Sequence, residues 1–433
     1  MTLPETDGLP ARRGWQDRAV DHRASAWAAS GAMVLTGRRD GPPLGAPSAL
    51  VDLVDRAAAV LRRRSEGRTL VDGLALLGER AALSDLARQG TTSCGGSTRL
   101  VHTADGWLAV SLARPDDIVA LPAWLGRDVP LDDPWPVVLE AAAIMNTPEL
   151  DDRAALLGLP FAALGSVPPC ADGAFGLPVR AVRVTELGGS ARTGAASPDA
   201  PLPIEGALVV DLSSLWAGPL CGQLLAASGA EVIKVESTLR PDGARQGPAS
   251  FFDLLNGEKR SVALDVSTPS GRRHLRHLVQ AADVVIESAR PRALEQMEIT
   301  ATDILGRAGG PRVWASITSH GRSPERRERV GFGDAAAVAG GLVAGDDAGP
   351  CFLADAVADP LTGLITAAAV LEALSAGGHW LVDAAMAPMA ARATGPLLDV
   401  RGEQAQPPRA RDFLQRAPEF GSDTAAVLRR LSP

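Results

Sequence analysis

Short runs of apolar, β-branched residues alternate with helical patterns along residues 207–318. The runs read as buried strands because each is brief and rich in Val and Ile. They are ALVVDLS (207–213), EVIKVE (231–236), RSVALDV (260–266), DVVIES (283–288) and RVWASIT (312–318). Between them, residues 218–229 and 268–282 read as helices, the second opened by Thr268 and Pro269, a typical N-cap and first-turn pair. This alternation of strands and helices predicts an α/β fold with a doubly wound, mainly parallel, Rossmann-like sheet.

The loops at the carboxyl ends of these strands are the expected ligand site, as in other open α/β sheets. No GxGxxG motif follows the first strand, so a standard dinucleotide site is not indicated. Instead, Gly218 and Pro219 open the next helix. The free N–H groups of such a helix start can receive a phosphate or a thioester oxygen.

Residues 185–205 are rich in Gly, Ser, Ala and Pro, which predicts an exposed linker near the middle of the chain. We therefore expect an N-terminal lobe over 1–184, a sheet domain over 206–395 and a C-terminal tail helix within 396–433 that packs on the sheet domain. Within the first part, we expect 93–168 to form a smaller α+β lobe, separate from the sheet.

The chain also repeats itself. Residues 27–81 and 337–391 share a G-x-[MV] motif, a Gly-Pro turn, AAAVL, a Gly-rich turn, LVD and a helix of small residues, in the same order. The order of these features favours a duplication. The position that aligns with Asp359 in the first copy is Ala49.

Composition excludes several classes of protein. A net charge of −8 argues against nucleic acid as a partner, because phosphate binding needs a basic surface. The four cysteines form no CxxC pair, and only His274 and His277 lie close together, so no metal site is indicated. Without a long apolar run or a cleavage signal, we expect a cytoplasmic protein that does not bind membranes.

Lysine is almost absent from the chain. Of 43 Lys and Arg residues, only Lys234 and Lys259 are lysines. In a sequence with such a bias toward arginine, these two positions stand out as candidates for a specific role.

Consecutive stretches of the second half resemble motifs of the family III CoA-transferases, the group of formyl-CoA and carnitine CoA-transferases, to which α-methylacyl-CoA racemase is related. The stretches are VVDLSSLWAGPLCGQLLAASGAEVIKVES (209–237), LLNGEKRSVALDVSTPSG (254–271), RVWASITSHGRSPERRERVGF (312–332), ADPLTGLITAAAVLEAL (358–374) and RAPEFGSDTAAVLRRL (416–431). Residues 95–113 and 155–168 resemble the small domain of the same family and its exit, so the domain order looks rearranged.

The resemblance implies coenzyme A as a co-substrate, with no tightly bound cofactor, and an acyl-CoA and a carboxylic acid as ligands. It places Asn256, Lys259 and Arg260 in the turn that holds the CoA nucleotide, with a weaker expectation for Lys234, which could instead be structural. The other implied contacts with CoA or the substrate-side loop are Trp216, Ala217, Arg290, Gly95 and Gly96. Ser237 and Gln296 stand where many members have arginine, which weakens the expected nucleotide site.

The family mechanism uses an aspartate that attacks the acyl-CoA and forms an aspartyl anhydride, followed by an aspartyl-CoA thioester. Asp359 fits the D-x-x-x-G frame of this nucleophile, although an Asp before Pro at a helix start is also an ordinary N-cap. Asp355 is the competing candidate.

Two other functions stay open. One is a non-catalytic homologue that binds acyl-CoA. The other is a racemase, disfavoured because Phe332 stands where the racemase histidine lies and cannot carry a proton. Family members form interlocked dimers, so the resemblance implies a homodimer.

Overall fold

The computed structural model of the chain describes residues 22–171, 173, 175–183, 200–305, 310–413 and 415–431. The predicted linker at 185–205 lies largely outside the described residues, because residues 184–199 are not among them.

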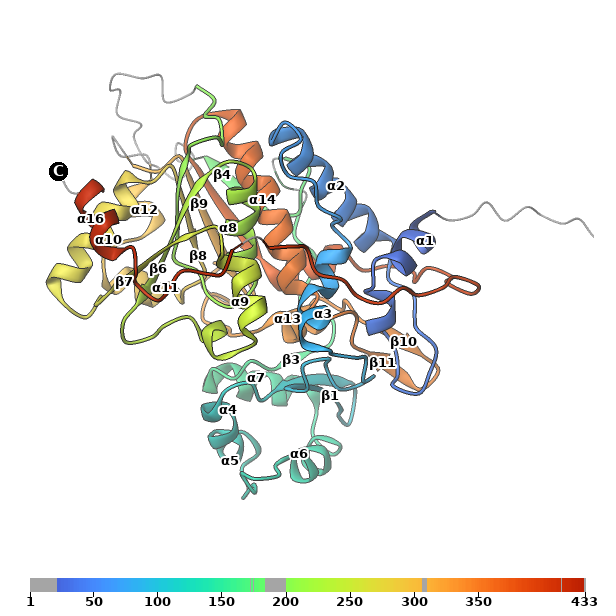
Figure 1. Ribbon diagram of the computed structural model, residues 1–433. Coiled ribbons are helices and arrows are strands. Elements are labelled where there is room, and N and C mark those ends of the chain that lie inside the picture. The colour runs from blue at the N-terminus through green and yellow to red at the C-terminus, as the bar shows by residue number, and fades with distance from the viewer. Residues whose placement is uncertain are drawn as a thin grey trace, which may run out of the picture.

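A seven-stranded sheet with the strand order β4-β12-β9-β8-β5-β6-β7 forms the centre of the molecule (Figure 1). All neighbouring strands run parallel except β4, which is antiparallel to β12. The strands are β4 (Arg180–Arg183), β5 (Leu208–Asp211), β6 (Glu231–Ser237), β7 (Arg260–Leu264), β8 (Val284–Glu287), β9 (Val313–Thr318) and β12 (Trp380–Ala385). The predicted α/β fold with a mainly parallel, doubly wound sheet is confirmed.

Helices cover both faces of this sheet because alternate strand residues point to opposite sides. Val209 and Val284 face the larger core, while their neighbours Val210 and Val285 face the smaller one. The larger core is covered by α2 (Ser48–Arg64), α8 (Ala217–Ala227), α9 (Ala249–Asn256), α13 (Gly333–Ala339), α14 (Ala358–Ala376) and α15 (Met386–Arg392). The opposite core contains residues of α10 (Pro269–Ala281), α11 (Pro291–Gln296), α12 (Ala301–Ile304) and α16 (Thr424–Leu431).

Helix α14 runs through the larger core between α8 and α2 (Figure 1). It is long and apolar enough to span a membrane by length and composition, but 83% of that window is buried inside the molecule. Its approach to α8 depends on Gly363, where an added Cβ would lie 2.6 Å from the carbonyl oxygen of Ala217. Such close packing fixes the start of α14 relative to the loop after β5.

A smaller α+β lobe lies at one end of the molecule, below the sheet in Figure 1. It contains the antiparallel sheet β1 (Thr98–His102), β2 (Trp107–Ser111) and β3 (Ala162–Ala163) with α4 (Pro115–Val119), α5 (Leu121–Leu125), α6 (Trp135–Ala142) and α7 (Thr147–Leu157). Trp124 and Phe161 meet edge to face in its own core, with ring centroids 4.7 Å apart. The lobe joins the rest of the molecule where the Gly165 and Val167 N–H groups donate to carbonyls of α13.

The N-terminal segment consists of α1 (His22–Ala29), η1 (Met33–Leu35), α2, η2 (Ala75–Gly78) and α3 (Glu79–Ser84). Its helix α2 lies beside α14, the helix that it matches in the internal repeat. The copies differ further along, because LVD at 381–383 lies in β12 whereas LVD at 70–72 forms no strand. In the second copy, the hairpin of β10 (Ala344–Asp346) and β11 (Gly349–Cys351) follows α13.

The C-terminal tail crosses the N-terminal segment first and then reaches the sheet. The Leu398 N–H donates to the carbonyl of Ala46, and the Gln406 N–H donates to the carbonyl of Ala28. Beyond this crossing, α16 packs against α10 and β7. The remaining short helix, η4 (Gly243–Gln246), follows β6. The division of the chain into the domains expected from the sequence stays a proposal.

Candidate active site

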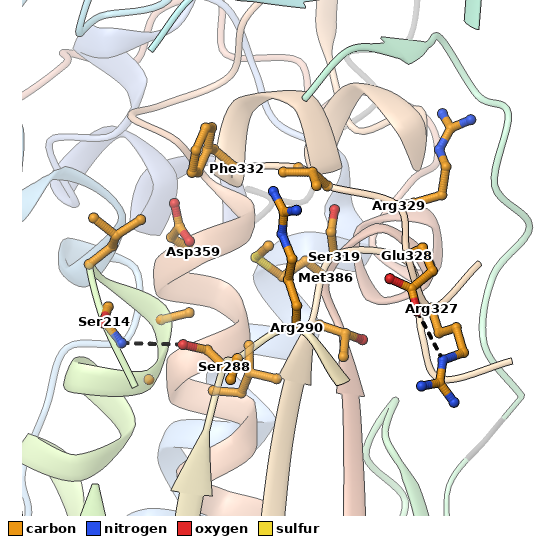
Figure 2. A pocket seen from close by; sticks show the side chains of 18 of the residues that line it. Ser214, Ser288, Arg290, Ser319, Arg327, Glu328, Arg329, Phe332, Asp359 and Met386 are labelled. Atoms are coloured by element: carbon orange, nitrogen blue, oxygen red, sulfur yellow. Dashed lines mark hydrogen bonds and ion pairs between the residues drawn. The ribbon is translucent and has the colours of Figure 1, made fainter. Parts of the chain in front are cut away.

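A cavity of about 250 Å³ lies beyond the carboxyl ends of β5, β8 and β9, facing the small lobe. This is the edge where an open parallel sheet is expected to bind its ligand. Residues from several elements line it, including Ser214, Ala217, Gly218, Ser288, Arg290, Ser319, Phe332, Asp359 and Met386 (Figure 2).

Asp359 lies in the first turn of α14 and lines the cavity. Its carboxylate accepts a hydrogen bond from the Gly333 N–H, with an N···Oδ2 distance of 3.1 Å. Burial raises its pKa to about 6, against the opposing effects of the Arg80 charge and of the Gly333 hydrogen bond, while Asp355 adds to the increase. At neutral pH the group is therefore mainly ionised, but less strongly hydrated than a surface aspartate.

Gly333 is the residue that permits this approach. An added Cβ at Gly333 would lie 2.3 Å from Asp359 Oδ2 and 2.5 Å from the carbonyl oxygen of Ala356, so no larger residue fits without a shift. Glycine is required here because backbone and carboxylate meet directly.

We expect Gly333→Ala to displace the Asp359 carboxylate and to reduce any reaction that depends on it by about 100-fold, since a misplacement of roughly 1 Å has that effect. A steady-state assay of the variant, with thermal unfolding as a measure of folding, checks this. The control is Gly41→Ala, in a turn that does not line the cavity, where an added Cβ meets nothing closer than Arg38 Cβ at 3.4 Å. Equal losses in the two variants would contradict the specific role of Gly333.

Asp355, the competing candidate, has a different environment. Its side chain is 0% exposed and accepts two hydrogen bonds from Arg80, with distances of 2.9 Å from Nε and 2.5 Å from Nη2. It does not line the cavity. Of the two aspartates, Asp359 is therefore the one placed to meet a ligand.

Asp334 is a third carboxyl in this region, and the sequence analysis did not single it out. It is buried at the start of α13, and burial raises its pKa to about 7, with a further increase from Asp355 and opposing effects of Arg80 and of a hydrogen bond from Ser93. Asp334 lies two residues after Phe332, the position of the racemase histidine, and this proximity is the sequence signal that could have marked it.

The two lysines lie beneath the loop that follows β5. Lys259 Nζ donates to Asp211 Oδ2 and to the carbonyl of Pro219, both at 2.8 Å. Lys234 Nζ donates to the carbonyl of Ser213 at 3.0 Å and lies 2.8 Å from Asp242 Oδ2.

Both ammonium groups are buried, and neither residue lines the cavity. Lys234, on β6, holds the loop after β5 at Ser213, and Lys259, just before β7, holds the first turn of α8 at Pro219. These contacts favour a structural role. A direct contact between Lys259 and CoA stays a prediction, and it would require the ion pair with Asp211 to open.

The other predicted site residues fall into two groups. Ala217 and Arg290 line the cavity with Asp359, and the Arg290 guanidinium rises toward its centre in Figure 2. Gly95 lies beside Arg80, since its added Cβ would be 3.3 Å from Arg80 Nη2, and Gly96 adopts a φ of 81° in the same turn.

Trp216, Asn256 and Arg260 do not line the cavity. Trp216 is buried against Phe251, with ring centroids 5.0 Å apart. Asn256 is buried and donates to the carbonyl of Phe252 at 3.1 Å. Arg260 is exposed and pairs with Glu231 at 2.9 Å. Their predicted contacts with the CoA nucleotide stay predictions.

Further arginines at the cavity come from segments that the sequence analysis left aside. Arg114, on the small lobe, lies over the Phe332 ring, with its guanidinium carbon 5.6 Å from the ring centroid. Arg327 and Arg329 precede Phe332 and also line the cavity. These residues could not be paired with Asp359 from sequence, because they come together only when the small lobe meets the sheet. Each of the three also pairs with a carboxylate, Arg114 with Asp117, Arg327 with Glu295 and Arg329 with Asp151. An anionic ligand would therefore meet their charge already partly balanced, and would gain most from Arg290.

Among the described residues, no group of three or more His, Cys, Asp and Glu side chains could hold a metal ion. The chain is thus an α/β protein with a carboxylate and several arginines at the carboxyl edge of its sheet. Residues 204–418 match the family model of CoA-transferase family III. Through this segment the chain belongs to CoA-transferase family III.

Curated relatives agree with this assignment. The chain is 34% identical over 191 residues to an acyl-CoA transferase of Fusarium pseudograminearum, covering 40% of this chain and 42% of the relative. It is 31% identical over 184 residues to the succinyl-CoA–D-citramalate CoA-transferase of Chloroflexus aurantiacus, covering 40% of this chain and 46% of that protein. The chain thus spans less than half the length of these relatives.

Among solved structures, a CAIB/BAIF family protein from Brucella suis aligns with 44% of this chain and 55% of its own, at 32% sequence identity and a TM-score of 0.39.

Proposed function

We propose that this protein transfers CoA from an acyl-CoA to a carboxylic acid, with Asp359 as the nucleophile. The observation that carries the proposal is the placement of Asp359. Of the two candidate aspartates, it is the one that lines the cavity at the carboxyl edge of the sheet, whereas Asp355 is enclosed by its ion pair. Membership of the family supports the same reaction class.

In the proposed reaction, the Asp359 carboxylate attacks the thioester carbonyl of the acyl-CoA, and the C–S bond breaks to give a mixed anhydride and CoA thiolate. The thiolate then attacks the aspartyl carbonyl, which releases the first acid and leaves an aspartyl-CoA thioester. The acceptor carboxylate attacks this thioester, and its C–S bond breaks to give a second anhydride and CoA thiolate again. The thiolate then attacks the acyl carbonyl of this second anhydride, which gives the new acyl-CoA and restores the Asp359 carboxylate.

The residues around Asp359 suit these steps. The Gly333 N–H holds one carboxylate oxygen and orients the other. The first turn of α8, with Ala217 and Gly218 at the cavity, presents N–H groups that have no partner within the helix and could stabilise charge on the thioester oxygen. Arg290 brings positive charge for the anionic ligands, while the charge of Arg114 at the cavity is already balanced by Asp117.

The nature of the acids is part of the proposal. A cavity of about 250 Å³ with several arginines suits a short, anionic acid better than a long acyl chain. The names of relatives include donors and acceptors of this kind, such as succinate, D-citramalate and oxalate. A homodimer and a cytoplasmic location, as expected from the sequence, stay predictions.

The test is an exchange assay in which purified protein is incubated with succinyl-CoA and a panel of carboxylic acids, and new acyl-CoA species are measured. Because the attacking form of Asp359 is the carboxylate, and its pKa is about 6, kcat/KM should be nearly constant above pH 7. It should fall about tenfold for each pH unit below about 5.5.

A stable complex with acyl-CoA and no exchange with any acid would favour the non-catalytic alternative. Exchange of the α-proton with solvent would favour the racemase. Phe332 lines the cavity at the position of the racemase histidine, and it offers no proton-transfer group.

A further inference from the structure

The loop that leads into α14 has an unfavourable backbone conformation. We call residues 352–357 the approach loop. Ala354 and Ala356 in this loop have φ values of 53° and 43°, in the left-handed region that residues with a Cβ rarely adopt. Such residues persist only where the surrounding structure holds them. The two alanines flank Asp355, and α14 begins directly after the loop.

The surrounding structure comes from the N-terminal segment and the turn between α3 and β1, not from the sheet domain. The approach loop forms a series of hydrogen bonds with these two regions, and each bond crosses more than half the chain. They are Phe352 N–H to Gly90 O (2.9 Å), Ala354 N–H to Thr36 Oγ1 (2.9 Å), Cys94 Sγ–H to Ala354 O (3.3 Å) and Asp355 N–H to Leu77 O (3.4 Å).

Arg80 is the centre of this contact. Its guanidinium donates two hydrogen bonds to the fully buried Asp355 carboxylate, at 2.9 and 2.5 Å. Its guanidinium carbon lies 4.9 Å from the centroid of the Trp216 ring, in cation–π contact. Gly95 has no side chain, which leaves room for the Arg80 guanidinium. A Cβ added at Gly95 would lie only 3.3 Å from Arg80 Nη2. Arg80 is therefore fixed on several sides.

The position of Asp359 depends on the same loop. The Asp359 N–H donates to the carbonyl of Ala356 at 2.8 Å, so the second strained alanine sets the first turn of α14. The charged groups that face Asp359 are Arg80 from α3, Asp355 from the approach loop, Asp334 from α13, and, across the cavity, Arg114, Arg290, Arg327, Glu328 and Arg329.

We propose that Arg80 is a positioning residue for Asp359, which acts by holding Asp355 and thereby the strained approach loop. The proposal rests on the proposed nucleophilic role of Asp359. It assigns a function to the N-terminal copy of the internal repeat, which carries Ala49 at the position of the nucleophile. That copy supports the reaction from outside the cavity. The Arg80 charge also lowers the pKa of Asp359, against the larger effect of burial.

The experiment compares wild type, Arg80→Gln and Arg80→Lys by two measurements. The first is a ¹³C NMR titration of aspartate carboxyls, in which the Asp359 signal is identified by its loss in Asp359→Asn. We expect Arg80→Gln to raise the midpoint by about one pH unit from about 6, because a nearby positive charge is removed. The second is steady-state kinetics, where kcat should fall by about 100-fold with a smaller change in KM. Arg80→Lys should bring both the titration midpoint and kcat part of the way back to their wild-type values.

The matched control is Arg411→Gln. Arg411 Nε pairs with Glu79 at 2.6 Å, so this change breaks the neighbouring ion pair on the same helix, α3, but not the contact with Asp355. We expect the titration midpoint to stay within about 0.2 pH units of wild type and kcat to stay within about twofold, measured below the unfolding transition, because Arg411 has no hydrogen bond to the approach loop among the described residues. Glu79 is only 1% exposed, so the loss of its cation should lower thermal stability instead. An equal effect of both variants would show that loosening α3 is sufficient, and would overturn the proposal.

The proposal would also be overturned if Arg80→Gln left the midpoint and kcat unchanged. If Arg80→Gln does not fold, Arg80→Gln/Asp355→Asn replaces it, since this variant removes both charges of the pair. The midpoint should still rise there, because the effect of Arg80 on Asp359 exceeds that of Asp355. The titration needs no acyl-CoA, so a wild type without exchange activity would contradict the proposed function while the role of Arg80 is still decided.

Discussion

Asp359→Asn is expected to abolish CoA transfer, with a decrease in kcat of at least about 1,000-fold. An amide has no anionic oxygen to attack a thioester, so neither anhydride nor aspartyl-CoA can form. The fold should persist, because Asn is nearly isosteric with Asp and its carbonyl oxygen can still accept the hydrogen bond from the Gly333 N–H. Helix capping is not affected, since the N-cap of α14 is Val357 and not Asp359, the N-cap that the sequence pattern had also allowed. The pKa of Asp359 is raised in the folded protein, so its ionised form is unfavourable there, and Asn should give equal or higher thermal stability at pH 7.5.

Covalent trapping identifies the residue directly. Wild-type protein incubated with acyl-CoA and hydroxylamine should form a hydroxamate on the peptide that contains Asp359, as shown by mass spectrometry after digestion. Asp355→Asn should retain the label on Asp359, although its activity falls because Arg80 loses its partner. Label on Asp355, or full activity of Asp359→Asn, would falsify the assignment of the nucleophile.

Lys259→Met is expected to cost about 3–5 kcal/mol of unfolding free energy, because it leaves the Asp211 carboxylate buried without its cation. The Asp211 side chain is 0% exposed and the Lys259 side chain 1%, so water cannot replace the lost interaction. The first turn of α8 would also lose the hydrogen bond from Lys259 to the Pro219 carbonyl. Chemical denaturation at pH 7.5 measures the effect.

The neighbouring residue provides the control. Arg260→Met removes an ion pair with Glu231 in which the arginine side chain is 46% exposed, and it should change the unfolding free energy by less than about 1 kcal/mol. Lys259→Met/Asp211→Leu should recover much of the lost stability, since both charges are then absent. If Lys259→Met weakened CoA binding and left stability unchanged, the lysine would instead be a ligand contact.

The sheet was predictable from the sequence because its signals are local. Runs such as ALVVDLS and DVVIES carry their strand preference in adjacent residues, and the structure places both in the parallel sheet. The direction of the sheet, in turn, indicated which loops form the site, and Ala217 and Arg290 do lie there.

The choice between Asp355 and Asp359 could not be made from sequence patterns. Both aspartates precede or begin the same helix, four residues apart. What separates them is the ion pair of Asp355 with Arg80, a residue 275 positions away. Similarly, the rarity of Lys259 marked the position as special, but its partner Asp211 lies on another strand, 48 residues upstream. Such pairings depend on tertiary structure, and no local pattern encodes them.

The contact between Arg80 and the approach loop also has a consequence for biosynthesis. The N-terminal segment, which contains Arg80, leaves the ribosome long before the approach loop is synthesised. At about 5–20 residues per second, the 275 residues between the two partners take roughly 15–50 s to synthesise. Until then α2 cannot pack against α14. Apolar residues such as Leu50 and Val54, which are fully buried in the folded protein, therefore stay exposed to solvent. The nascent chain is therefore expected to need chaperone protection during this interval, and the proposed catalytic centre is completed only after the approach loop has been synthesised.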